Sequence, residues 1–157
     1  EKKFKPIFGE NFFKYYEKEI FSDIEYSYVP YFAPGKTLAD NLNESNISNT
    51  IFLENHGLVC SGESFSDAFE RSMRVNEACK RWLVNHSLNF KVFSPSFESE
   101  QKSYLFPDAV ILEKVLSINN YIIHTQREVG LQPRYLSEND IDFIRNMEEE
   151  KYRESIL

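Results

Sequence analysis

The sequence predicts an α/β fold built as one domain over residues 1–157. An apolar run from Ile51 to Cys60 is broken by the polar turn Glu54-Asn55-His56-Gly57, a pattern typical of two short strands joined by a turn. Residues 64–86, which follow directly, carry apolar side chains at helical spacing. With 157 residues and 15% aromatic side chains, the chain can bury a sizeable core.

The first part of the chain predicts alternating helices and strands. Residues 9–22 suit a short amphipathic helix. Residues 26–32 are aromatic and β-branched, which favours a strand, and Pro30 places that strand at an edge or near its end. Residues 33–35, Ala-Pro-Gly, predict a turn, and residues 36–42 a short helix.

The central part contains the clearest pattern. We expect strands at residues 50–53 and 58–60, followed by a long helix at residues 64–86. Ser64 and Asp67 fit a capping box, in which a hydroxyl and a carboxylate satisfy free amide groups at the start of a helix. The helix carries a stripe at helical spacing: Phe65, Ala68, Phe69, Met73, Asn76, Cys79 and Leu83.

The last part predicts a strand followed by a helical tail that begins at about residue 114. Residues 109–112 are apolar and predict the strand, while residues 115–129 predict a helix that ends before a glycine. A second capping box at residues 137–140 opens a final helix over residues 138–154, whose apolar stripe is thin.

Charge and composition exclude several classes of function. The net charge of −7 argues against nucleic acid or an anionic membrane as the partner. No apolar run approaches the roughly 20 residues needed to span a bilayer. The first residues lack the apolar segment of a secretory signal, and Cys60 and Cys79 form no C-x-x-C pair, so we expect a reducing, cytoplasmic location.

Two stretches resemble the class II aldolase and adducin-like domain family. The first runs from Val29 to Ala39 and contains Pro34-Gly35 before a Leu-Ala helix start; the second is Phe52-Leu53-Glu54-Asn55-His56-Gly57-Leu58-Val59, followed by the helix that contains Asp67-Ala68-Phe69. The resemblance covers roughly residues 9–112, the C-terminal part of the family domain. It implies a three-layer α/β/α fold with a mainly antiparallel central sheet, incomplete here at its N-terminus.

The resemblance also implies a metal site. In the family, three histidines hold a zinc ion that polarises a carbonyl or enediolate: two from a His-x-His pair and one from the Asn-His-Gly-Leu motif. Only the last has a counterpart here, His56, since the chain contains no His-x-His. The family's catalytic glutamate and phosphate-binding loops also have no counterpart. Zinc, or another divalent cation, is therefore implied only if the native protein supplies the missing ligands.

The residues around His56 leave alternatives open. The imidazole is either a metal ligand or a turn side chain satisfied by a backbone carbonyl. Glu54 lies two residues earlier, so on a strand the two side chains could share a face. Its carboxylate is then either a hydrogen-bond partner that fixes the tautomer of the His56 ring or a solvated group at the strand end. Cys60 is better explained as an apolar strand position than as a ligand. Tyrosines that could donate a proton lie at positions 26, 28, 31, 135 and 152, and the sequence assigns no catalytic residue.

The implied function is part of a zinc-dependent lyase or epimerase that acts on a small sugar phosphate or sugar acid and assembles as a homo-oligomer. The chain alone is not expected to catalyse this reaction, because most of the catalytic site is missing from it. The alternative is a non-catalytic, adducin-like interaction domain that keeps the fold without the chemistry. A His-x-His pair and a preceding glutamate upstream in the native protein would favour the enzyme.

Overall fold

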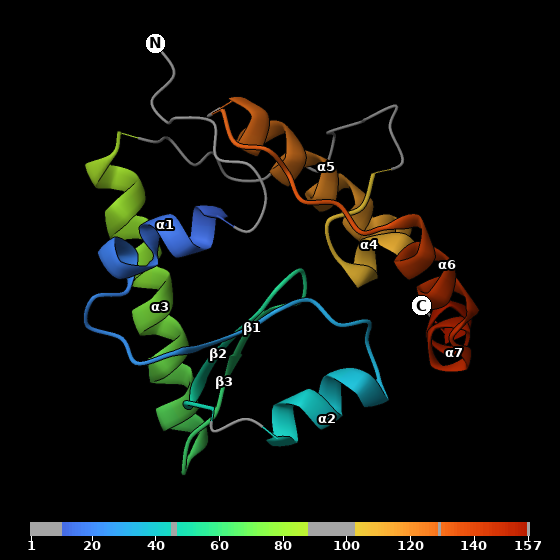
Figure 1. Ribbon diagram of the computed structural model, residues 1–157, viewed down its shortest axis with the longest axis horizontal. Coiled ribbons are helices and arrows are strands. Elements are labelled where there is room, and N and C mark those ends of the chain that lie inside the picture. The colour runs from blue at the N-terminus through green and yellow to red at the C-terminus, as the bar shows by residue number, and fades with distance from the viewer. Residues whose placement is uncertain (1–10, 45–46, 88–102, 129, 157) are drawn as a thin grey trace. The chain divides into compact units, whose positions relative to one another are not determined.

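A computed structural model describes residues 11–44, 47–87, 103–128 and 130–156 (Figure 1). Contacts divide the chain into two compact units. The sheet unit comprises residues 10–32 and 36–92, and the helical unit contains the rest of the chain. The expectation of one domain over residues 1–157 stays a prediction, since compact units of this kind also occur within single domains.

The sheet unit contains three strands in the order β1-β2-β3. β1 (Ser27–Val29) runs parallel to β2 (Thr50–Leu53), with Ser27 opposite Ile51, and β2 runs antiparallel to β3 (Gly57–Cys60). The predicted α/β class is confirmed, but the predicted antiparallel character holds only for β2 and β3. Parallel neighbours need a crossover connection, and α2 (Lys36–Glu44) lies between β1 and β2 in the chain, where residues 36–42 predicted a helix.

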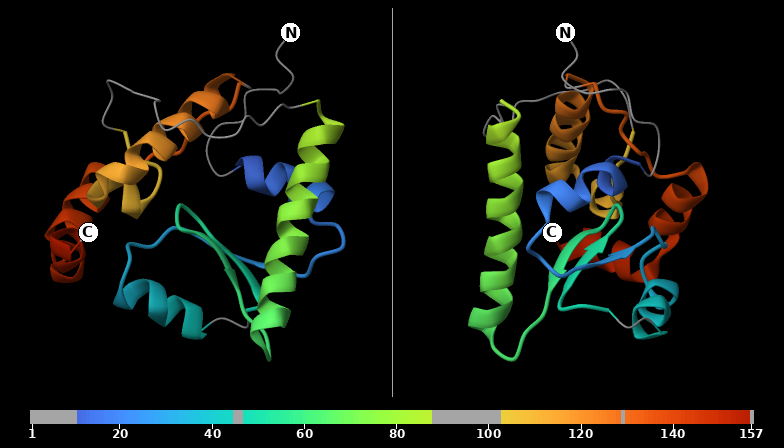
Figure 2. Two further views of the ribbon diagram at one scale, coloured as in Figure 1. Left: turned by 180° about the vertical axis from the view of Figure 1, so that it is seen from behind. Right: turned by 60° about the vertical axis from the view of Figure 1, so that its left-hand side comes forward.

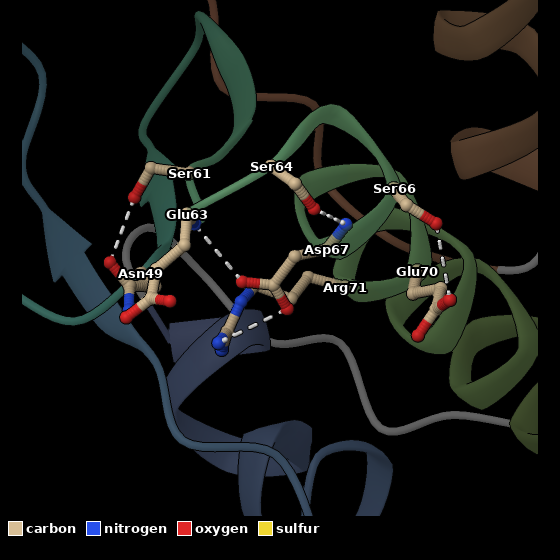
Figure 3. Close-up of polar contacts among 8 residues, drawn as sticks. All are labelled: Asn49, Ser61, Glu63, Ser64, Ser66, Asp67, Glu70 and Arg71. Atoms are coloured by element: carbon tan, nitrogen blue, oxygen red, sulfur yellow. Dashed lines mark hydrogen bonds and ion pairs between the residues drawn. The ribbon is translucent and has the colours of Figure 1, made fainter.

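Two further helices belong to this unit, α1 (Asn11–Ile20) and α3 (Phe65–Asn85), and they contact each other (Figure 2). α3 begins as predicted at Ser64, whose Oγ accepts a hydrogen bond from Asp67 N at 3.2 Å. The Asp67 carboxylate accepts from Glu63 N at 3.2 Å and lies 3.6 Å from Arg71 Nη2 (Figure 3). Asp67 therefore stabilises both the turn before the helix and its first turns.

The buried face of α3 differs from the predicted stripe. Phe65 and Phe69 are 86% and 55% exposed, whereas Val75, Ala78 and Trp82 are buried. Val75 and Ala78 pack with Phe21, and partly buried side chains surround this cluster: Ile20, Ile24, Tyr26, Phe52 and Cys79. The spacing of apolar residues predicts the position of the helix in the sequence. Because α3 has apolar residues on more than one face, the elements packed against it determine which face is buried.

The helical unit contains α4 (Pro107–Ile111), α5 (Glu113–Glu128), α6 (Glu138–Asn146) and α7 (Glu148–Ile156). The predicted strand at residues 109–112 is wrong, because this segment lies in α4 and at its C-terminal end. Pro107 at the first turn has the φ of a helix, and Asp108 is an acidic residue near the positive end of the helix dipole. Apolar residues in so short a run do not distinguish a strand from a buried helix.

The predicted start of the final helix is confirmed, but the predicted helix over residues 138–154 is two helices, α6 and α7. Both bonds of the capping box at Ser137 and Asp140 are present. Met147, however, has an extended ψ of 129°, and α7 starts at the next residue. The three glutamates of the Glu148–Glu150 run favour a new helix start, where the dipole stabilises negative charge. In the described parts of the chain, no helix has the length and apolar character to cross a membrane.

Candidate functional site

The turn between β2 and β3 explains why asparagine and glycine flank His56. His56 N donates to the Leu53 carbonyl at 3.0 Å, which closes a turn with Asn55 at its third position. Asn55 has φ 59°, a left-handed conformation that asparagine tolerates better than most residues. Gly57 has φ 126°, a conformation that residues with a Cβ atom disfavour. The backbone geometry thus favours asparagine at position 55 and glycine at position 57, and places no such demand on His56.

The segment that follows β1 lies beside this turn. Glu54 N donates to the Val29 carbonyl at 3.0 Å, which continues the pairing of β1 and β2 by one residue. Tyr31 N then donates to Glu54 Oε2 at 2.9 Å. Pro30, which has no N–H, falls between these two bonds, and β1 is an edge strand of the described sheet, as Pro30 predicted. Glu54 therefore joins the turn to the end of β1 through both its backbone and its side chain.

The imidazole of His56 has two contacts in this segment. Its Nε2 lies 2.8 Å from the Phe32 carbonyl oxygen, and its ring stacks on Tyr31 with centroids 5.4 Å apart and planes 16° from parallel. A carbonyl only accepts, so Nε2 carries the proton in this bond. In the neutral ring, the lone pair then lies on Nδ1.

These features lie within a stretch that matches a known family. The family model for the class II aldolase and adducin N-terminal domain matches residues 4–83. The chain belongs to this family. Comparisons with curated proteins and with solved structures gave no match. The match contains the turn, the end of β1 and nearly all of α3, so the site described above belongs to the family domain.

The predicted pair, Glu54 and His56, lies together in this family turn, but in an arrangement that the sequence did not predict. The Glu54 carboxylate holds the backbone of Tyr31, and the Nε2 partner of His56 is the Phe32 carbonyl. The ring is thus satisfied by a backbone carbonyl, one of the two alternatives for His56. Phe32 was missed because its carbonyl, and not its side chain, makes the contact, and no residue type marks such a contact in a sequence.

Of the five candidate tyrosines, Tyr31 is the one that the structure places against His56. Tyr26 packs instead with Phe21 and Phe52. Burial, a hydrogen bond with Glu17 and the charge of that carboxylate raise the pKa of Tyr26 to about 12. Tyr135 lies in the helical unit, where its hydroxyl accepts from Arg127 at 2.7 Å. Tyr31 is therefore the tyrosine that the site uses, as a stacking surface for the imidazole.

The described residues contain no complete set of protein ligands for a metal ion. Among them, no group of three or more His, Cys, Asp or Glu side chains could hold a metal ion. His86 lies 2.9 Å from the Trp82 carbonyl through Nδ1 and 3.3 Å from Glu19 through Nε2, and His124 pairs with Glu128 in α5. The imidazole of His56 fits the role of one ligand, but the described residues do not supply the rest of a zinc site.

Cys60, at the end of β3, does not extend the donor set. Burial raises the pKa of its thiol, although a hydrogen bond with Thr50 and the charge of Arg71 act in the opposite direction. Zinc binds the thiolate, so a raised pKa weakens this residue as a ligand. Cys79 has a thiol pKa that burial also raises. Both cysteines act as partly buried apolar residues, in line with their interpretation from sequence.

Proposed function

We propose that this chain is part of a divalent-metal-dependent enzyme, a carbon–carbon lyase or epimerase acting on a small sugar phosphate or sugar acid, in which His56 is one ligand of the metal. Family membership supports the reaction class. The observation that carries the ligand role is the hydrogen bond from His56 Nε2 to the Phe32 carbonyl. Metal-binding histidines typically donate their other ring N–H to such a partner, which fixes the tautomer and the ring orientation.

Zinc is the metal that the family membership favours, and when bound it would stabilise the oxyanion that forms as a carbon–carbon bond breaks. Catalytic zinc normally has three protein ligands. His56 would hold the metal while Phe32 orients its ring, and the proposal requires that the native protein supply the further ligands that the described residues lack. We also propose that the native protein has a three-layer α/β/α domain, forms a homo-oligomer and is located in the cytoplasm.

The contacts of Glu54 and His56 are also consistent with a second function, that of a non-catalytic interaction domain. Both ionisable side chains of the turn already bind the end of β1: Glu54 through Tyr31 N and His56 through the Phe32 carbonyl. If their role ends there, they stabilise the turn, and the chain is a non-catalytic, adducin-like interaction domain. The two functions differ in whether His56 also binds a metal.

Thermal unfolding of the native protein with added zinc, and with a chelator, separates the two functions, because the first of them requires that this protein supply the further ligands. His56→Gln keeps an amide N–H that can reach the Phe32 carbonyl but removes the imidazole lone pair. His124→Gln is the matched control, because His124 is exposed on α5 and pairs with Glu128. If His56 is a ligand, zinc raises the unfolding temperature of the wild type and of His124→Gln, but not of His56→Gln.

The interaction domain predicts a different result. In that case zinc leaves the unfolding temperatures of the wild type, His124→Gln and His56→Gln unchanged. His56→Ala, which loses the hydrogen bond to the Phe32 carbonyl, unfolds at a lower temperature than His56→Gln. A zinc effect of equal size in the wild type and in His56→Gln would contradict His56 as a ligand.

A further inference from the structure

We infer that Glu54 is a positioning residue for His56, which acts through the backbone of Tyr31 and Phe32. The inference rests on the proposed function for the role of the metal, but the positioning itself concerns contacts within this chain. All the residues involved belong to the sheet unit.

The Glu54 carboxylate takes the place of the Glu54 backbone carbonyl in the pairing of β1 with β2. In a parallel pair of strands, a residue that donates its N–H to one neighbour accepts, through its carbonyl, from the residue two positions further along. Glu54 N donates to the Val29 carbonyl, so a regular ladder would join Tyr31 N to the Glu54 carbonyl. Instead Tyr31 N donates to Glu54 Oε2 at 2.9 Å, and the chain turns at Asn55. The carboxylate continues the ladder where the backbone leaves it.

The backbone groups that face β2 at this point also matter. In a parallel ladder alternate residues pair with the neighbour, so among residues 29–31 the Val29 carbonyl and the Tyr31 N–H face β2, while Pro30 faces the open edge. Glu54 binds both of them, one through its backbone and one through its side chain. Hydrogen bonds to a carboxylate are stronger than those between neutral groups. The Glu54 side chain therefore helps to hold the chain after Pro30 against β2.

The two hydrogen bonds of Glu54, to the Val29 carbonyl and from Tyr31 N, form a clamp that also bears on the imidazole of His56. The ring of Tyr31 stacks on His56, and the carbonyl of the next residue, Phe32, accepts from His56 Nε2 at 2.8 Å. Both contacts of the imidazole thus come from the two residues that follow Pro30. By fixing Tyr31 N, Glu54 fixes the carbonyl that selects the tautomer with its lone pair on Nδ1.

Two variants and two measurements test this role. Glu54→Gln keeps an oxygen acceptor for Tyr31 N at the same reach, whereas Glu54→Ala removes it. The tautomer of His56 is read from the imidazole ¹⁵N chemical shifts of the metal-free native protein, assigned by their loss in His56→Gln. Zinc affinity is measured by titration of the same proteins.

Glu54→Gln is expected to keep the wild-type tautomer and to bind zinc within about threefold of the wild type. Glu54→Ala is expected to populate both tautomers and to weaken zinc binding by roughly 10- to 100-fold, the effect typical of losing an outer partner of a ligand. If Glu54→Ala does not fold, Glu54→Asp is used, because its carboxylate is one methylene too short to reach Tyr31 N, and it should behave as the alanine variant would.

Three results would overturn the inference: an unchanged tautomer in Glu54→Ala, or in Glu54→Asp where that variant replaces it, or a glutamine variant as impaired as the alanine variant. The last would mean that the negative charge matters and the hydrogen bond does not. If the wild type binds no zinc, the proposed function fails, and the tautomer comparison still decides whether Glu54 positions His56.

Discussion

Replacing Gly57 by alanine tests whether backbone geometry fixes the turn that presents His56. Gly57 has φ 126°, and a Cβ added there would meet nothing within 4 Å. The cost of Gly57→Ala is therefore backbone strain without a steric clash, which amounts to about 1–3 kcal/mol of unfolding free energy. With a urea slope of about 1–3 kcal/mol per M, the unfolding midpoint should fall by roughly 1 M.

Fluorescence of Trp82 is a suitable assay for this change. Trp82 is the single tryptophan of the chain and is 6% exposed on α3, in the same unit as the turn. Asn55→Gly is the control, because glycine adopts φ 59° without strain, and its greater freedom in the unfolded chain offsets that gain to within about 0.5 kcal/mol. An unchanged midpoint for Gly57→Ala would show that the strained φ is not required, and the reasoning about the motif would be wrong.

Two further predictions concern the two units separately. Burial and Glu17 raise the pKa of Tyr26 from 10.0 to about 12, so the folded state holds this proton more tightly than the unfolded state. The resulting stability is present below about pH 10 and is lost as the pH rises towards 12, and Tyr26→Phe should remove this part of the alkaline loss in urea midpoints. In α6, Ile144 is 0% exposed and Ile144→Ala should cost about 2–5 kcal/mol, measured by far-ultraviolet circular dichroism in urea. The neighbouring Phe143→Ala, at a 51% exposed site, should change stability by less than about 1 kcal/mol, and equal losses in the two variants would contradict the assigned faces of the helix.

The sequence correctly predicts the strand bounds and helix starts that depend on residues close together in the chain. The strand at residues 50–53 has the predicted bounds, and the helix starts at Ser64 and Ser137 follow from side chains that cap their own backbone. The break at Met147 was missed because no proline or glycine marks it. Such a feature depends on packing between segments distant in the chain, which a local pattern does not contain.

The candidate site shows the same limit. His56 and its turn were predicted from a motif whose asparagine and glycine satisfy local backbone geometry. The Phe32 carbonyl, the stacking of Tyr31 and the clamp made by Glu54 depend on the parallel pairing of β1 with β2. The sequence predicted the two strands but described the sheet as mainly antiparallel, so it could not show which backbone groups would face the imidazole.

The central claim is that His56 is a metal ligand in a member of the class II aldolase and adducin family. Elemental analysis of the native protein as purified, beside the His56→Gln variant, tests it most directly. We expect about one divalent metal ion per chain in the native protein and almost none in the variant. A native protein without metal, or a variant that retains it, would contradict the claim and leave His56 as a structural residue of the turn.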